Sequence, residues 1–312
     1  MKPRGARVRG LPAGGGRNGG PMIESMIQFL LAGLTSGAIY ALVGLGFSII
    51  YNASHVINFA QGEFIVIGGM STVALLAAGV PLPLAIVLAT IVTMAVGMAL
   101  AKFAIQPARD ADVVALIIIT IGASIFLRGI VQLVFGKDIH SLPHFSGETP
   151  LNLLGATLLP QSLWVMGISA ALIVVMAWFF NATLAGKAML ATAYNALAAR
   201  LMGVDTKWVL LSAFALSALL GAVGGIVVTP ITFVSYESGI MLGLKGFSAA
   251  VLGGLGNGIG AVAGGLILGI VEALSAGYLS SAYKDAIAFI IILVVLVARP
   301  NGLFGKKGID RV

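Results

Sequence analysis

The chain has 312 residues, of which 59% are hydrophobic and only 9% are charged, and its formal net charge is +7. A soluble domain carries roughly 25% charged residues because its surface faces water, so this composition excludes an ordinary water-soluble globule. It indicates an all-α, polytopic bundle of membrane-spanning helices, and we estimate about eight to ten spans. The chain has no cysteine, which excludes disulfides and thiol chemistry.

The positive charge is concentrated at the N-terminus. Five basic residues precede position 21 and supply +5 of the net +7, which leaves +2 for the rest of the chain: Lys2, Arg4, Arg7, Arg9 and Arg17. A single basic tail is not a nucleic-acid-binding face, so we expect no nucleic-acid partner. Because it has little to bury, the range 1–25 is expected to be a disordered basic extension.

Apolar runs that reach membrane-spanning length with their flanks follow in chain order. They cover residues 26–50, 65–78, 84–103, 113–135, 163–180, 208–228, 266–278 and 286–298. We therefore assign 26–300 to one transmembrane domain and 301–312 to a C-terminal tail.

The distribution of Lys and Arg between the loops predicts their sides of the membrane. The basic connection 181–207 and the basic tail 301–312 are assigned to the cytoplasm, and the connection 136–161, with one lysine, to the outside. These assignments require an even number of crossings between residues 207 and 299. The stretch 243–258 must therefore cross as well, or one segment must be re-entrant.

The connection 181–207 is too polar to span, and its composition predicts one short surface helix bracketed by Gly186 and Gly203. Four aromatic or aliphatic residues recur at helical spacing: Leu190, Tyr194, Leu197 and Leu201. They predict an apolar face with Arg200 at its rim, of the kind that fills a groove in a partner protein.

The stretch "GLKGFSAAVLGGLGNGIGAVAGG" (243–265) is rich in glycine. It lacks the strand and the intact glycine pattern of a dinucleotide-binding loop, and no Gly-Lys-Ser/Thr sequence occurs in the chain. The spacing of Gly254 with Gly258 favours a helix face that packs closely against another helix. Alternatively, an interruption at Gly254 and Gly256 exposes backbone groups beside a water-filled path.

Polar groups at membrane depth are costly and therefore need an explanation. Asn58, Gln61 and Glu63 stand at the entrance of the second apolar run, while Arg128 and Glu272 lie inside others. Glu237 and Lys245 flank the connection between the sixth and seventh runs. Two interpretations stay open: these groups form interhelical pairs that hold the bundle, or Asn58, Gln61 and Glu63 line a permeation path.

The sequence lacks the side-chain sets of an enzyme. His140 and His144 have the spacing of half a metal site, but Pro143 breaks the helix that would align them. We expect no catalytic residue, no metal and no cofactor.

Several ordered motifs carry a family resemblance. They include "GLTSGAIYALVGLGFSIIY" (33–51), "VINFAQGEFIVIGG" (56–69), "LIIITIGASIFL" (116–127), "GKAMLATAYNALAARLMGV" (186–204) and the glycine-rich stretch continued to 274. Together they resemble the smaller, H-type permease of bacterial branched-chain amino-acid ABC importers. The family usually has histidine where Gln61 stands and commonly arginine where Leu190 stands.

The resemblance implies a non-enzymatic pore subunit of the inner membrane. Its implied partners are a second permease, two cytoplasmic ATPases and a periplasmic or lipid-anchored substrate-binding protein, with 186–203 docking on the ATPase. Three alternatives stay open: a permease for urea, short amides or other small amino acids; a self-sufficient secondary transporter or channel; and a membrane scaffold without a path.

Overall fold

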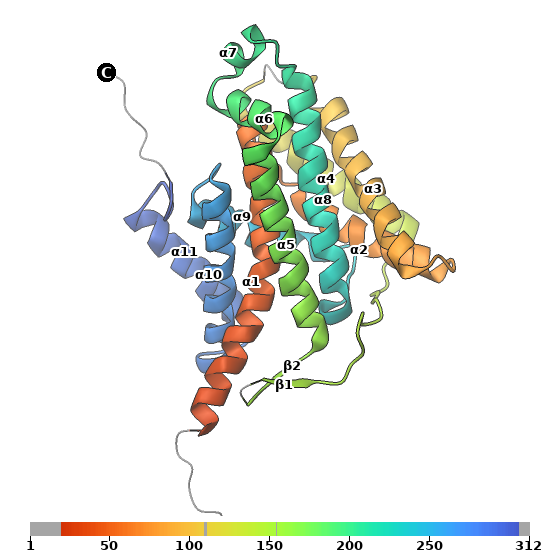
Figure 1. Cartoon of the computed structure of the whole chain (residues 1–312), viewed down its shortest axis with the longest axis vertical. Helices are drawn as coiled ribbons and strands as arrows, with labels where there is room; N and C mark the ends of the chain where they lie inside the picture. Colours follow the sequence, from red (N-terminus) through yellow and green to blue (C-terminus); the bar gives the residue numbers. More distant parts are fainter. Residues whose placement is uncertain (1–19, 109–110, 154, 306–312) are drawn as a thin grey trace, which may run out of the picture.

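A computed structural model describes residues 20–108, 111–153 and 155–305 (Figure 1). Helices make up nearly all of the regular structure in these ranges, which confirms the predicted all-α class. The elements are α1 (Gly20–Ser54), α2 (Gln61–Ala77), α3 (Leu82–Leu100), the π-helix η1 (Ala101–Ile105), α4 (Val113–Phe135), β1 (Leu151–Leu153), β2 (Ala156–Leu158), α5 (Pro160–Ala182), α6 (Leu184–Tyr194), α7 (Ala196–Leu201), α8 (Thr206–Thr232), α9 (Ser238–Gly253), α10 (Gly258–Tyr278) and α11 (Lys284–Ala298).

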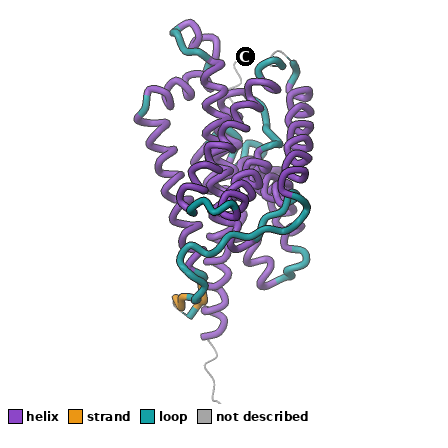
Figure 2. The backbone as a smooth tube through the Cα atoms, turned by 90° about the vertical axis from the view of Figure 1, so that its right-hand side faces the viewer, coloured by secondary structure: helices purple, strands orange, loops and turns teal. Residues whose placement is uncertain are grey.

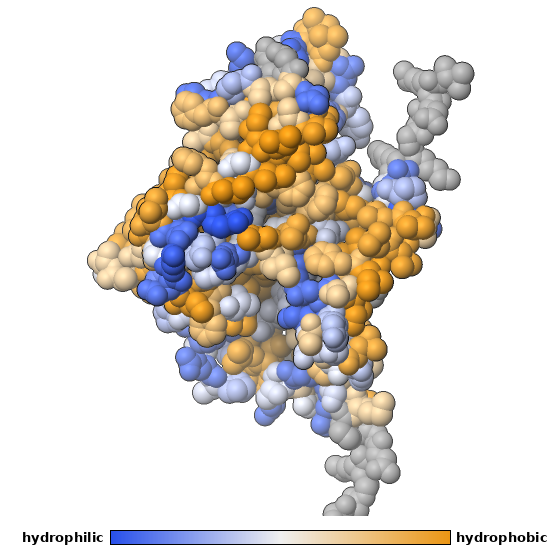
Figure 3. Space-filling model, turned by 180° about the vertical axis from the view of Figure 1, so that it is seen from behind, coloured by the Kyte–Doolittle hydropathy of each residue, from blue (hydrophilic) through white to orange (hydrophobic). Residues whose placement is uncertain are grey.

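Six helical segments of the described chain are long and apolar enough to cross a membrane: α1, α3 with η1, α4, α5, α8 and α10. Helices α2, α9 and α11 are shorter, so the estimate of eight to ten spans stays a prediction. Figure 3 shows one face of the molecule as a largely hydrophobic surface with hydrophilic patches. Such a surface suits contact with lipid better than contact with water.

The first helix begins earlier than predicted. It starts at Gly20, so the last residues of the predicted extension 1–25 belong to α1, because Met22 and Ile23 continue the apolar run. The preceding part of that extension, 1–19, and the end of the predicted tail, 306–312, lie outside the described residues.

Helix α1 lies at the centre of the bundle, and its closest partner is α10. A Cβ atom added at Gly269 would lie 2.3 Å from the backbone nitrogen of Gly37 and 2.4 Å from the carbonyl oxygen of Gly33. On the same face of α10, a Cβ at Gly265 would lie 2.4 Å from the nitrogen of Ala41. The small faces of the two helices thus allow backbone-to-backbone contact, the arrangement that replaces hydrophobic drive within a membrane.

The two predicted polar connections lie at opposite ends of the bundle, as their opposite assignments require. Helices α6 and α7 lie at the upper end in Figure 1, and the antiparallel pair β1–β2 lies at the lower end. The long loop that contains these strands crosses the bundle in Figure 2. The Gln28 side chain ties it to α1, since its Nε2 donates to Thr157 O and its Oε1 accepts from Thr157 N, both at 2.7 Å. Which end is cytoplasmic remains a prediction.

The glycine-rich stretch contributes to two helices, and the crossing expected of 243–258 stays a prediction. It forms α9, a reverse turn and α10, with φ of +102° at Gly254 and +83° at Gly256. Asn257 caps α10, because its Oδ1 accepts from the Gly260 amide at 3.1 Å. The expectation that Gly254 and Gly258 share a helix face was therefore wrong, since left-handed glycines and a capping asparagine reverse the chain between them.

Candidate functional site

Helix α2 begins inside the protein rather than at its surface. Its predicted polar residues meet there: Asn58 and Gln61 are 0% exposed, and Glu63 is 1% exposed. The Asn58 side chain folds back on the turn, and its Oδ1 accepts from the Ala60 amide at 3.2 Å. Every residue of α2 from Gln61 to Thr72 is buried. The start of α2 thus carries several polar side chains that the bundle encloses.

Both the oxygen and the nitrogen of the Gln61 side-chain amide form hydrogen bonds. Its Oε1 accepts from the Ser217 hydroxyl at 2.5 Å, and its Nε2 donates to the Ser217 carbonyl oxygen at 3.2 Å. Gly46 of α1 leaves room for it, because a Cβ there would lie 2.5 Å from Nε2. Gln61 therefore ties α2 to α8 and passes close to α1.

A polar stripe on α4 binds the start of α2. Thr120, Ser124 and Arg128 follow one another at intervals of four, so they lie on one face of the helix. The Thr120 hydroxyl accepts from the Phe59 amide at 3.3 Å. Ser124 Oγ and Arg128 Nη2 donate to the same oxygen, Glu63 Oε1, at 2.9 and 2.8 Å. The pairing anticipated for intramembrane charges is therefore present between Glu63 and Arg128.

Three polar atoms of this group have no hydrogen-bond partner although each is buried: Glu63 Oε2, Arg128 Nε and Asn58 Nδ2. A buried polar atom without a hydrogen-bond partner costs free energy, because the protein interior does not replace the hydrogen bonds that water would make. The group can therefore accept one further hydrogen bond and donate at least two. We call Asn58, Glu63, Ser124 and Arg128 the α2–α4 polar site.

A second set of buried charges joins four other elements. Lys245 of α9 lies 2.7 Å from Glu272 of α10 and 2.7 Å from Asp285 of α11. The Tyr40 hydroxyl of α1 donates to Glu272 Oε2 at 2.8 Å. Lys284 approaches Glu272 at 3.7 Å. The sequence pointed to Lys245 and Glu272 separately, but Tyr40 and Asp285 could not be recognised as partners, since nothing in periodicity links positions so far apart.

The predicted path residues Gly254 and Gly256 lie elsewhere. A Cβ at Gly254 would lie 2.8 Å from the nitrogen of Gly305, and the carbonyl oxygen of Gly256 accepts from Asn52 Nδ2 at 2.8 Å. The segment after α11 packs on this turn, with the Leu303 amide donating to the Leu252 carbonyl oxygen at 2.8 Å. The structure does not bring the two glycines to the α2–α4 polar site, because they serve the turn between α9 and α10.

The connection 181–207 forms two helices, so the prediction of one helix was wrong. Asn195 is extended (φ −158°, ψ 98°), and its Oδ1 caps α7 by accepting from the Ala198 amide at 2.9 Å. Gly186 lies within α6 instead of bracketing it, and its missing Cβ lets α6 approach the Phe179 carbonyl oxygen. Gly203, with φ of +89°, follows the C-cap residue Met202 in the left-handed conformation and so marks the end of α7, as the predicted bracket requires.

The predicted apolar face is only partly exposed. Tyr194, Leu197 and Leu201 are 81%, 67% and 81% exposed, and the neighbouring Arg200 is also exposed. Met202, which the helical spacing did not include, is 85% exposed. We call Tyr194, Leu197, Leu201 and Met202 the α6–α7 surface.

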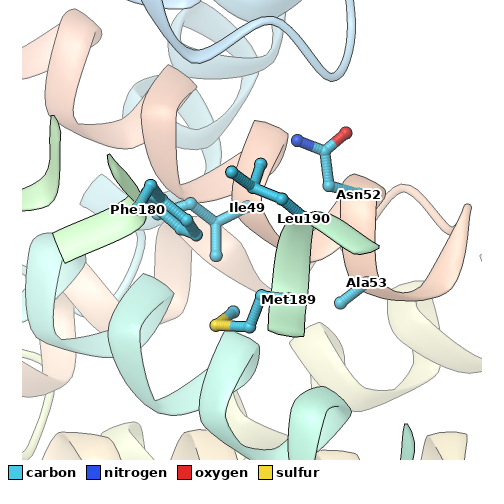
Figure 4. Close-up of a pocket in the computed structure, with 6 residues that line it drawn as sticks. All are labelled: Ile49, Asn52, Ala53, Phe180, Met189 and Leu190. Atoms are coloured by element: carbon cyan, nitrogen blue, oxygen red, sulfur yellow. The ribbon is translucent and has the colours of Figure 1, made fainter. Parts of the chain in front are cut away.

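Leu190 does not belong to this surface, because it lies against the end of α1. It is half-buried in a small pocket between α6 and the end of α1 (Figure 4). The other lining residues are Ile49, Asn52, Ala53, Phe180 and Met189.

Comparison with known proteins identifies the family. Residues 29–296 match the family described as "Branched-chain amino acid transport system / permease component". The chain belongs to this family. It is therefore a membrane transport permease and a multi-pass protein of the inner (plasma) membrane, which confirms the resemblance seen in its motifs.

Relatives match this permease along nearly its whole length. The high-affinity branched-chain amino acid transport system permease protein LivH of Escherichia coli (strain K12) is 33% identical over 310 residues, covering 93% of this chain and 100% of the relative. BraD of Pseudomonas aeruginosa is 31% identical over 308 residues, covering 94% and 100%.

More distant relatives carry other names. The autoinducer 2 import system permease protein LsrC of Escherichia coli (strain K12 / DH10B) is 34% identical over 190 residues, covering 58% of this chain and 54% of the relative. Among solved structures, PsaBC from Streptococcus pneumoniae in complex with Fab has a TM-score of 0.45 and 13% identity, covering 88% of this chain and 90% of that chain. The latter similarity is too distant to support an argument.

Proposed function

We propose that this permease is one membrane subunit of an ATP-driven importer that moves branched-chain or other hydrophobic amino acids into the cell. The carrying observation is the alignment with LivH, which covers 93% of this chain and all of the relative. The proposed complex also contains a second permease, two cytoplasmic ATPases and a periplasmic or lipid-anchored substrate-binding protein. This chain itself catalyses no reaction, and the ATPases supply the energy.

The α6–α7 surface is the proposed docking site for an ATPase subunit. It presents four large apolar side chains next to Arg200, at the end of the bundle that the loop charges assign to the cytoplasm. Exposed apolar clusters beside polar residues are typical of sites that another protein covers. Short helices of this kind seat their apolar side chains in a groove of the partner.

The start of α2 is the proposed part of the translocation path. In transporters, a helix that begins at membrane depth directs its partial positive charge at a substrate carboxylate. Here Asn58, Gln61 and Glu63 surround such a start. Of the three, Gln61 has both its amide oxygen and its amide nitrogen hydrogen-bonded to Ser217, so we assign it a supporting role and assign the path to the α2–α4 polar site.

Reconstitution tests the proposal directly. The permease would be co-expressed and purified with candidate ATPases and a candidate second permease, placed in liposomes and supplied with a candidate binding protein. We expect uptake of radiolabelled L-leucine, L-isoleucine and L-valine that requires ATP inside the liposomes. Uptake driven by an ion gradient without ATP would instead establish a secondary transporter, and ATP-dependent uptake of urea or short amides alone would replace the proposed substrate.

A further inference from the structure

We infer that the α2–α4 polar site binds the zwitterionic head group of the substrate, which takes the place of the ion pair between Glu63 and Arg128. The inference rests on the proposed function and adds to it the chemical group that is recognised and the residues that recognise it. In the bound state, the α-ammonium group pairs with Glu63, and the α-carboxylate pairs with Arg128 and Asn58.

The hydrogen-bonding capacity of the site matches that head group. Glu63 Oε1 already accepts from Ser124 and Arg128, whereas Oε2 accepts nothing. An ammonium group has donors but no acceptor, so it suits Oε2. Arg128 Nε and Asn58 Nδ2 are donors without acceptors, and a carboxylate supplies acceptors for both.

Charge balance favours a zwitterion over a simple cation, anion or amide. The pair seen in the structure is neutral overall, and exchanging it for a zwitterion leaves each ion opposite one unlike charge. A substrate that lacks its ammonium group leaves the buried Glu63 without a counter-charge, and one that lacks its carboxylate leaves the partly buried Arg128, whose side chain is 24% exposed, without one. A neutral amide supplies dipoles only, which compensate a buried ion less well than an opposite charge does.

The packing of α4 shows where the site opens. Only four residues of α4 are buried, namely Leu116, Thr120, Ser124 and Val131, while α2 is buried throughout its first half. Because Asn58 is 0% and Glu63 1% exposed, a substrate reaches them only if α4 separates from the start of α2. Three polar contacts, through Thr120, Ser124 and Arg128, are the ones that break. The substrate replaces the strongest of these, the ion pair.

Cysteine labelling tests the site on the assembled complex without the binding protein, so that recognition by the binding protein does not contribute. The chain contains no cysteine, and Ser124→Cys places a single thiol beside Glu63. We expect N-ethylmaleimide to label it slowly, and L-leucine at ten times its Kd to slow labelling about tenfold. Isoamylamine, which lacks the carboxylate, and 4-methylpentanoate, which lacks the ammonium group, are expected not to protect at that concentration. Equal protection by all three compounds, or none by L-leucine, would overturn the inference.

Charge reversal separates substrate binding from a purely structural ion pair. Glu63→Gln and Arg128→Gln, each added to Ser124→Cys, are expected to raise the L-leucine concentration needed for half-maximal protection roughly 100-fold or more. Glu63→Arg combined with Arg128→Glu again forms an ion pair. We expect this double variant to assemble with the ATPases, and we expect L-leucine not to protect its thiol. In the control, Glu148→Gln in the exposed loop after α4, L-leucine should protect the thiol as it does in the parent.

The outcomes distinguish the inference from the proposed function. If the reversed pair recovers the parent's affinity for L-leucine, the pair is structural and the inference is wrong, although the permease still imports amino acids. If the parent complex imports no amino acid, the proposed function fails whatever the variants do.

Discussion

Adding a single methyl group at Gly269 is expected to separate α1 from α10. The Cβ of Gly269→Ala would lie 2.3 Å from Gly37 N and 2.4 Å from both Gly37 Cα and Gly33 O, which are all backbone atoms. No flexible side chain can move aside, so the two helices must separate by roughly 1 Å to reach ordinary contact distances near 3.5 Å.

The expected cost follows from that separation. Overpacking in a well-packed interior typically costs about 1–3 kcal/mol, and a gap of 0.5–1 Å removes a quarter to a half of the dispersion energy of the atoms around it. We therefore expect a loss at the upper end, about 3 kcal/mol. The helix propensity of alanine offsets at most about 1 kcal/mol of it.

Thermal stability in detergent measures this effect. The fraction of monodisperse permease after heating would be followed by size-exclusion chromatography for Gly269→Ala and for the matched control Gly129→Ala. Gly129 lies within α4, and a Cβ added there meets no heavy atom within 4 Å. We expect the control to be as stable as the parent or slightly more stable, and Gly269→Ala to lose at least about 5 °C. Equal stability of the two variants would refute the close contact between α1 and α10.

Three further predictions address other parts of the molecule. Leu197→Asp places a carboxylate on the α6–α7 surface and is expected to cost several kcal/mol at the interface, so the ATPases should no longer co-purify. Ile139 at the opposite end is similarly exposed, at 73% against 67% for Leu197, so Ile139→Asp should keep the ATPases, and retention in both variants would disprove the docking assignment. Lys245→Met removes the cation that Glu272 and Asp285 share. Lys284 still approaches Glu272 and Asp285 is partly exposed, so we expect a loss of about 3 kcal/mol, the lower end for a broken buried pair, measured as thermal stability. An unchanged midpoint would contradict the role of this cluster. Beginning translation at Met22 retains the apolar helix Met22–Ser54 and should leave insertion and uptake intact, and loss of insertion would show that the upstream residues direct topology.

The sequence by itself determined that this protein lies in a membrane and which of its polar residues need a partner there. Few charges and long apolar runs require a membrane, and each ion within those runs needs a counter-charge, so Glu63, Arg128, Lys245 and Glu272 could be singled out in advance. Local backbone chemistry was also readable at Gly203, because a glycine after an apolar helical stretch favours the left-handed cap found there.

Only the tertiary structure decided which groups meet. Glu63 pairs with Arg128 across 65 positions, and Lys245 pairs with Glu272 across 27. In a membrane, hydropathy reports removal from water and not burial in protein, so it cannot separate α2, enclosed by other helices, from α4, exposed on most of its surface.

The same limit explains the errors at glycine and asparagine. Helical spacing placed Gly254 on a helix face and carried one helix through Asn195, because small residues suit a tight helix contact and a turn equally well. Contacts with segments distant in sequence decide between a continuous helix and a turn. The segment 301–305 packs on the turn at Gly254, and α6 packs against the end of α1 at Leu190. Such choices depend on contacts between distant segments, and a local pattern does not contain them.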